Sequence, residues 1–75
     1  MIRVDVDSSS VRAVGYSAVS QDLEIEFLSG EVYRYQGVGP DVHAGLLLAT
    51  SKGRYVNGVI KKHFQYRRVG GGARE

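Results

Sequence analysis

Hydrophobic and polar residues alternate along the first half of the chain, which is the pattern of half-buried β-strands. Residues 2–7 alternate isoleucine and valine with charged residues, which predicts a half-buried strand or an extended arm, until a serine run interrupts them. Residues 11–19 are rich in β-branched and small residues, and Gly15 marks a bulge or a close approach of the backbone. Residues 22–27 alternate most regularly, and residues 31–36 supply an antiparallel partner.

The turn between these last two strands decides which face carries the tyrosines. A two-residue turn requires a positive φ at Ser29, whereas a three-residue loop over residues 28–30 places Gly30 in the left-handed region. We favour the three-residue loop, which predicts the cross-strand pairs Ile25–Tyr33, Leu23–Tyr35 and Glu24–Arg34. Both tyrosines then face the core, and the charged pair faces solvent.

The second half of the chain has helical periodicity. Pro40 and Asp41 begin a helix whose wide apolar stripe predicts that it is mostly buried: Val42, Leu46, Leu47, Leu48 and Ala49. Ser51 caps a second helix, whose core-facing residues are Val56, Val59, Ile60, His63 and Phe64. Residues 65–69 are a candidate short strand. We therefore predict an α+β domain over residues 1–69, with an antiparallel meander of three to four strands, two helices packed on one face, and a flexible C-terminal tail over residues 70–75.

Composition limits what such a domain can be. The 75 residues leave room for one core, and the absence of cysteine excludes disulfides and thiolate metal ligands. No apolar run is long enough to cross a membrane, and the charged N-terminus differs from a signal peptide. We expect a cytoplasmic protein that has no membrane partner.

Charge is divided unequally along the chain. Residues 1–51 carry three arginines against seven carboxylates, a net charge of −4, and residues 52–75 carry seven lysines and arginines against one glutamate, a net charge of +6. A polyanion is the natural partner of such a basic segment, because neutralised phosphates release counterions. The alternative is a solvated basic helix face that has no ligand.

The residues of this basic segment form the candidate nucleic-acid site. Arg54 and Lys61 are seven residues apart and are predicted to lie on one side of the second helix. Residues 51–54 could hold a phosphate at the helix N-terminus, or could form an ordinary turn between helices. The complete candidate set is Lys52, Arg54, Tyr55, Asn57, Lys61, Lys62, Tyr66, Arg67 and Arg68. Tyr55 and Tyr66 are included for base stacking, although Tyr55 could equally seal the interface between helix and sheet.

Residue patterns typical of enzymes are incomplete in this sequence. The glycines at 37 and 39 lack the third glycine of a dinucleotide fingerprint, and no Walker-type phosphate loop occurs. His43 and His63 lie on different predicted helices with no cysteine to complete a zinc site. We therefore expect no enzymatic activity, no catalytic residues, no cofactor and no metal.

Two sets of residues resemble the KTSC domain, a small domain found at the C-terminus of some lysyl-tRNA synthetases and as a stand-alone bacterial protein. One set runs from the serines at 9 and 10 through Val14-Gly15-Tyr16 to Tyr33-Arg34-Tyr35, and the other contains Ser51, Gly53, Tyr55, Val56, Asn57 and Ile60. The resemblance covers residues 9–66 and implies an accessory domain, for which RNA binding is a suggested role.

Charge and resemblance together predict an RNA-binding domain, with DNA as a less favoured ligand. The alternative is a protein-interaction module that uses a strand edge or the acidic sheet face to bind another protein or a second copy of the chain.

Overall fold

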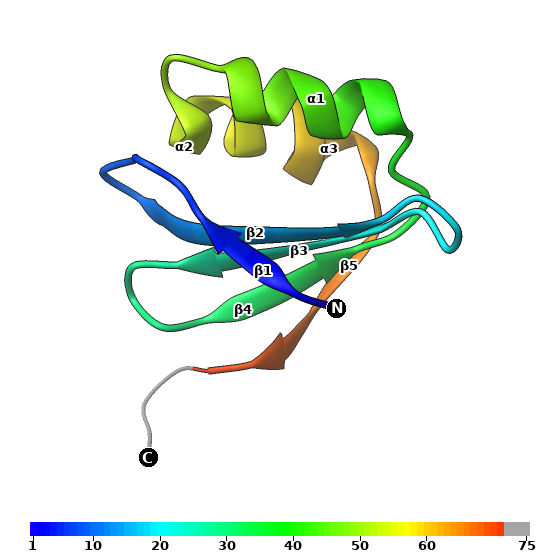
Figure 1. Ribbon diagram of the computed structural model, residues 1–75, viewed down its shortest axis with the longest axis horizontal. Coiled ribbons are helices and arrows are strands. Elements are labelled where there is room, and N and C mark those ends of the chain that lie inside the picture. Colours follow the sequence, from blue (N-terminus) through cyan, green and yellow to red (C-terminus); the bar gives the residue numbers. More distant parts are fainter. Residues whose placement is uncertain (72–75) are drawn as a thin grey trace.

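The computed structural model describes residues 1–71, which form one antiparallel sheet with helices on one of its faces (Figure 1). The strands follow the order of the chain across the sheet: β1 (Arg3–Asp5), β2 (Val11–Ser17), β3 (Asp22–Phe27), β4 (Val32–Tyr35) and β5 (Tyr66–Gly70). The expectation of three to four strands was therefore too low. The two weakest patterns, at residues 2–7 and 65–69, both pair, and they form the two edges of the sheet.

The register of the central hairpin is the predicted one. Leu23 pairs with Tyr35, Glu24 with Arg34, and Ile25 with Tyr33. The Gly30 N–H donates to the Phe27 carbonyl at 2.9 Å, and Gly30 has a φ of 99°. The three-residue loop is thus confirmed, and its glycine adopts the conformation that other residues avoid.

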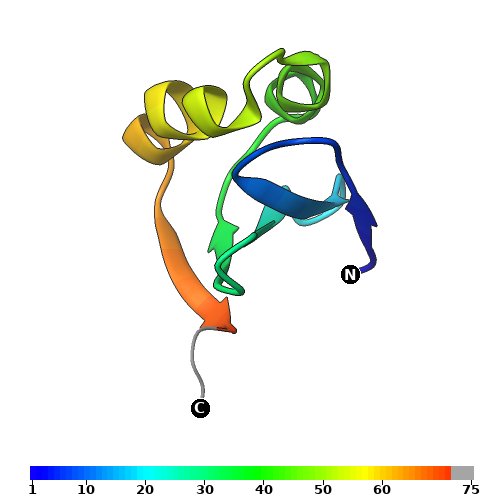
Figure 2. The same cartoon turned by 90° about the vertical axis from the view of Figure 1, so that its left-hand side faces the viewer.

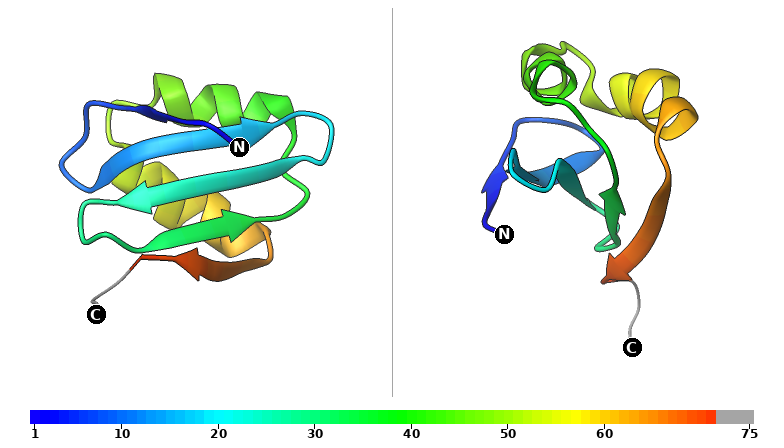
Figure 3. Two further views of the ribbon diagram at one scale, coloured as in Figure 1. Left: turned by 60° about the horizontal axis from the view of Figure 1, so that its bottom comes forward. Right: turned by 90° about the vertical axis from the view of Figure 1, so that its right-hand side faces the viewer.

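The core lies between the sheet and a single layer of two helical stretches, which lie side by side on one face of the sheet (Figure 2). Helix α1 (Pro40–Leu48) lies over β2, and a second helical stretch lies over β4 and β5 (Figures 2 and 3). This second stretch consists of α2 (Lys52–Tyr55), the π-helical η1 (Val56–Ile60) and α3 (Lys61–His63). The fully buried residues come from both layers: Val11, Leu23, Ile25, Tyr35, Val38, Leu46, Val56 and Ile60.

Two predicted apolar faces are exposed. Leu46 is the only buried residue of α1, while Leu47 is exposed and Leu48 is 84% exposed, so α1 is not mostly buried. On β1, Ile2 and Val4 are exposed, and Val6 packs against the core. The exposure of apolar residues on α1 and on β1 has one cause. Both elements lie at the margin of the molecule, where no other described element covers these side chains.

Segment η1 contains one residue more than a regular helical turn requires. The Lys61 N–H donates to the carbonyl of Val56, five residues earlier, instead of to a carbonyl four residues earlier. Phe64, eight residues after Val56, then packs against the core, in the place that a regular helix would give to His63. His63 is exposed, which corrects its predicted core position.

The C-terminal boundary also differs slightly from the prediction. Strand β5 includes Gly70, the first residue of the predicted tail, and residues 72–75 of that tail lie outside the described residues. No helix among residues 1–71 is long and apolar enough to cross a membrane.

Candidate nucleic-acid interface

Five basic residues lie on the side of the molecule that holds the second helical stretch and β5. This side is opposite to the edge formed by β1, because β1 and β5 end the sheet (Figure 2). We call it the cationic surface, and its residues, all exposed, are Arg54, Lys61, Lys62, Arg67 and Arg68. The exposed Asn57 lies on the same helical stretch. The structure thus brings together on one side residues that a 14-residue interval separates in the sequence.

The wide turn of η1 changes the alignment of these charges. In a regular helix Arg54 and Lys61 would lie nearly in line, but one additional residue rotates everything after it by about 100°. Lys62, eight residues after Arg54, is therefore in line with it instead of Lys61. Arg54 and Lys61 both belong to the cationic surface, and the prediction that they share one side of the helix assumed an unbroken α-helix, which the wide turn interrupts.

The N-terminus of α2 forms a closed turn between the helices. The Arg54 N–H donates to the Ser51 hydroxyl at 3.4 Å, which confirms Ser51 as the cap. A Cβ on Gly53 would lie 2.9 Å from the Ser10 hydroxyl oxygen, so the loop before β2 packs on this glycine. The Lys52 ammonium donates to the Ala49 carbonyl at 3.1 Å and so caps the end of α1. This geometry favours the interpretation as a turn.

The tyrosines of the sheet form an aromatic cluster on the helix-facing side. Tyr33 lies 5.8 Å from Phe27 and 5.8 Å from Tyr66 between ring centroids, and both pairs are near perpendicular. Tyr35 lies 5.2 Å from Tyr66 and is only 2% exposed. Burial raises the pKa of Tyr35 to about 12, with smaller contributions from Tyr66 and Tyr33. Tyr33 and Tyr35 are thus core-facing residues, as predicted.

The two candidate stacking tyrosines occupy different environments. Tyr55 is half-buried, its hydroxyl donates to the Val42 carbonyl at 3.3 Å, and its ring packs on Gly45 of α1. It therefore seals the contact between α1 and α2. Tyr66 is 42% exposed and lies next to Arg67 on β5. Of the two, only Tyr66 offers much of its ring to solvent.

The opposite face of the sheet contains a buried carboxylate that the sequence placed in solvent. Glu24 is 5% exposed and accepts hydrogen bonds from Arg34 at 2.6 Å and Arg3 at 2.8 Å. Burial raises the pKa of Glu24, but the hydrogen bonds and charges of the two arginines outweigh burial and hold that pKa below its ordinary value of 4.5. The sequence pattern found Arg34 and missed Arg3.

Gly15 explains how Arg3 reaches this carboxylate. Arg3, Gly15 and Glu24 are consecutive partners across β1, β2 and β3. A Cβ on Gly15 would lie 3.0 Å from the Cγ of Arg3 and 3.0 Å from the Ile2 carbonyl oxygen. The glycine therefore leaves the space through which the arginine crosses β2, which confirms the predicted close approach. This glycine is the one sequence signal that could have indicated a crossing side chain.

Salt bridges separate the charges of the protein into a paired and an unpaired set. Within residues 1–71, every arginine outside the cationic surface is paired with Glu24 or Glu26: Arg3, Arg12 and Arg34. On the cationic surface, Arg68 has one 3.5 Å contact with Glu31, and no salt bridge is formed within residues 1–71 by Arg54, Lys61, Lys62 or Arg67. The positive charge available to a ligand is therefore concentrated on one side.

The histidines lie apart and in different environments. His43 stacks on Tyr16 at 4.3 Å between ring centroids, and burial lowers the pKa of His43. The Tyr16 hydroxyl donates to the Val38 carbonyl at 2.6 Å, so this pair fixes the segment that leads into α1. Residues 1–71 contain no group of three or more histidine and carboxylate side chains placed to hold a metal.

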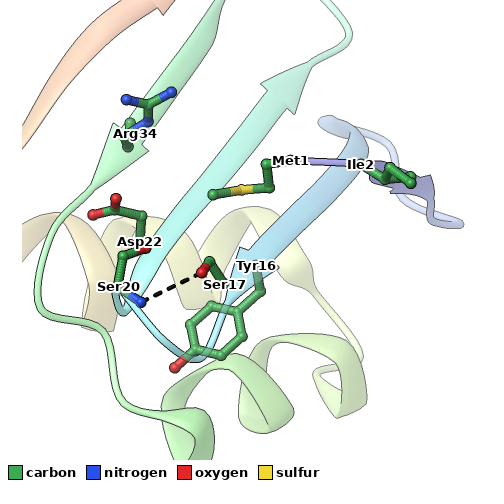
Figure 4. A pocket seen from close by; sticks show the side chains of 7 residues that line it. All are labelled: Met1, Ile2, Tyr16, Ser17, Ser20, Asp22 and Arg34. Atoms are coloured by element: carbon green, nitrogen blue, oxygen red, sulfur yellow. Dashed lines mark hydrogen bonds between the residues drawn. The ribbon is translucent and has the colours of Figure 1, made fainter.

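A shallow pocket that the sequence did not predict lies at one end of the sheet (Figure 4). Its volume is about 530 Å³, and it is lined by Met1, Ile2, Tyr16, Ser17, Ser20, Asp22 and Arg34. The Arg34 guanidinium is committed to Glu24, and the Ser17 hydroxyl accepts the Ser20 N–H at 3.4 Å. The pocket is thus open to solvent, and two of its polar side chains already form hydrogen bonds within the protein.

Comparison with known proteins places this geometry in a family. Residues 7–64 match the KTSC domain family. An uncharacterized protein of Stutzerimonas stutzeri is 49% identical over 70 residues, which cover 92% of this chain and 99% of the relative. The crystal structure of a KTSC domain protein from Yersinia pestis matches with a TM-score of 0.87 at 39% identity, covering 92% of this chain and 97% of that chain. A lysine–tRNA ligase of Nostoc punctiforme is 38% identical over 63 residues, which are 84% of this chain and 11% of the ligase.

Proposed function

This chain belongs to the KTSC domain family, and we propose that it is a nucleic-acid-binding domain that prefers RNA to DNA and binds phosphates through the cationic surface. The observation that carries the proposal is the separation of charge: the carboxylates of the sheet neutralise the arginines around them, while four of the five cations of that surface have no salt bridge within residues 1–71. Unpaired, exposed cations on one side suit a polyanion.

The relatives support RNA as the polyanion. A region similar to this chain occurs within proteins named lysine–tRNA ligases, whose named substrate is a tRNA. The cytoplasm is the compartment that we propose for such a function. Asn57 is a further polar contact in the proposal, and Lys52 contributes charge while its ammonium caps α1.

The proposal is tested by neutralising four cations together. We expect the variant Lys61→Gln, Lys62→Gln, Arg67→Gln, Arg68→Gln to lose at least about tenfold in affinity for tRNA at low salt, because each phosphate that is no longer neutralised keeps its counterions. Its salt dependence should also fall by about 0.7 log units of affinity per log unit of salt for each such phosphate on a single strand. Fluorescence anisotropy over a salt series measures both quantities.

Arg12→Gln is the matched control for this variant. Arg12 is an exposed arginine outside the cationic surface, and it contacts Glu26 at 3.7 Å. Its neutralisation should change tRNA affinity by less than about twofold. Equal affinity of the fourfold variant and the wild type, with circular dichroism showing both folded, would rule the proposal out.

A protein-interaction function is the second candidate, and one observation favours it. Strand β1 is an edge strand of three residues, and beside it Ile2 is 87% exposed. The acidic sheet face is a weaker docking site than the strand edge, because Glu24 and Glu26 are already paired with arginines. Binding through a strand edge depends on backbone hydrogen bonds and would show little dependence on salt.

A further inference from the structure

Tyr66 is an exposed aromatic residue that the fold holds in place within the cationic surface. The Tyr35 ring packs against it at 5.2 Å with an angle of 35° between the planes, and Tyr33 lies nearly perpendicular to it at 5.8 Å. Although these two rings hold it, 42% of Tyr66 remains exposed. A ring that is already fixed loses little conformational freedom when a ligand stacks on it.

The strand that carries Tyr66 places charge on both sides of this ring. Tyr66 pairs with Tyr35, Arg67 with Arg34 and Arg68 with Tyr33, so Tyr66 and Arg68 lie on the helix-facing side and Arg67 on the opposite side. Strand β5 is also an edge strand, so no other described strand covers its outer side. A flexible nucleotide chain that follows this edge can meet the ring and the cations of both faces.

The availability of base faces distinguishes the nucleic acids that can use this arrangement. Inside a duplex, each base is stacked between its neighbours and cannot cover a protein side chain with its face. An unpaired base has a free face, and stacking on aromatic side chains is the common mode of single-strand binding. An exposed, fixed ring among cations therefore suits unpaired nucleotides.

We infer that the RNA bound by the cationic surface is single-stranded at β5, with one unpaired base stacked on Tyr66 and its flanking phosphates bound by Arg67 and Arg68. This inference rests on the proposed function and adds to it the class of RNA and the residue that selects it. The selectivity arises from the ring, since the cations alone would bind duplex and single strands.

The test compares three variants on two RNAs. The RNAs are an unstructured 12-nucleotide single strand and a blunt duplex of the same length, and affinity is measured by anisotropy at fixed salt. Tyr66→Leu should weaken binding of the single strand by about 5- to 150-fold, the range typical of truncating an aromatic side chain on which one base stacks, and should change duplex binding by less than about twofold. Tyr66→Phe should retain the affinity for the single strand, because the ring remains. Val69→Ala, at another exposed apolar residue of β5, should change neither affinity.

The outcomes separate this inference from the proposed function. If the wild type binds both RNAs and Tyr66→Leu weakens both equally or neither, the stacking inference is overturned and phosphate binding stands. If the wild type binds neither RNA, the proposed function fails and takes the inference with it. If circular dichroism shows that Tyr66→Leu is unfolded, the affinities of Tyr66→Phe and of the wild type for the two RNAs decide the question. A wild type that binds the duplex as tightly as the single strand contradicts the inference.

Discussion

Single residues determine how this small sheet tolerates a carboxylate in its interior. Glu24 is buried beneath two arginines, one from the neighbouring β4 and one that crosses β2 over a glycine. Removing one member of a buried charged pair leaves the others without a partner, which costs more than the pair itself contributes. Both arginines are about one-third exposed, so water compensates part of that cost.

Substitution Glu24→Gln should lower the free energy of unfolding by about 1–3 kcal/mol at pH 7, since a neutral amide cannot replace the carboxylate in the three charge-assisted hydrogen bonds from Arg34 and Arg3. Because the folded pKa of Glu24 lies below its unfolded value, the stabilisation is present above pH 4.5 and is lost as the pH falls through the folded pKa. The difference between wild type and variant should therefore shrink on acidification below pH 4.5. Urea unfolding at a series of pH values measures it.

Glu31→Gln is the control for this experiment. It removes a carboxylate of larger exposure, which contacts Arg68 at 3.5 Å. Its effect at pH 7 should stay within about 0.5 kcal/mol. A loss of stability in Glu24→Gln that is the same at pH 3 and pH 7 would contradict the assigned role of the charge.

At the scale of elements, two of the helical glycines lie in opposite surroundings. Gly58 lies in η1, where an added Cβ would meet nothing within 4 Å. Gly45 lies in α1, where an added Cβ would overlap the hydroxyl of Tyr55 and lie 2.9 Å from its Cζ atom. The first glycine only loosens its helix, whereas the second makes room for a neighbouring ring.

The same substitution should therefore have opposite effects at these two positions. Gly58→Ala should raise the free energy of unfolding by about 0.5–1 kcal/mol, because alanine restricts the unfolded chain and favours the helix. Gly45→Ala should lower it by about 1–3 kcal/mol, because the Tyr55 ring must move. Thermal and urea unfolding of the two variants check both signs, and a destabilised Gly58→Ala would mean that the wide turn requires glycine.

The elements were predictable to different degrees, for reasons that lie in the residues. The hairpin register followed from Ser29 and Gly30, since only the glycine readily adopts a positive φ; this determines the turn type, and the turn determines the pairing. The wide turn was not predictable, because the apolar residues of 56–64 also fit the core-facing stripe of a regular α-helix. Only the structure shows that Phe64 packs against the core while His63 is exposed. The basic residues of the candidate site could be identified from the sequence. Their positions around the helical stretch could not, because these positions depend on the wide turn.

At the scale of the whole molecule, the two edge strands of the sheet make different contributions. The β1 edge covers β2 and supplies Arg3 to the buried carboxylate, while the β5 edge belongs to the cationic surface. Three strands separate these edges. The exposure of Ile2 and Val4 was unpredictable from alternation, because periodicity identifies two faces of a strand without saying how many are covered.

Removing residues 2–5 should therefore affect stability and leave RNA binding unchanged. The shortened chain loses the pairing of β1 with β2 and one of the two arginines on Glu24, so its free energy of unfolding should fall by at least about 1 kcal/mol. Its affinity for tRNA should stay within about twofold of the wild type. Urea unfolding and anisotropy on the same sample measure the two effects, and a large loss of affinity in a folded sample would show that the edges are coupled.

The order of the strands also has a consequence for folding kinetics. The first four strands pair with their neighbours in sequence through short turns, whereas β5 reaches β4 only after the 30 residues that contain the helices. Contacts between distant residues form slowly, because a long loop must close first. We therefore expect the meander of β1–β4 to form early and β5 to dock late, so that backbone amides of β5 exchange with solvent deuterium before those of β3. The β5 part of the cationic surface is then the last to be assembled, and a chain interrupted before residue 66 would lack Arg67 and Arg68 while keeping the three cations of the helical stretch.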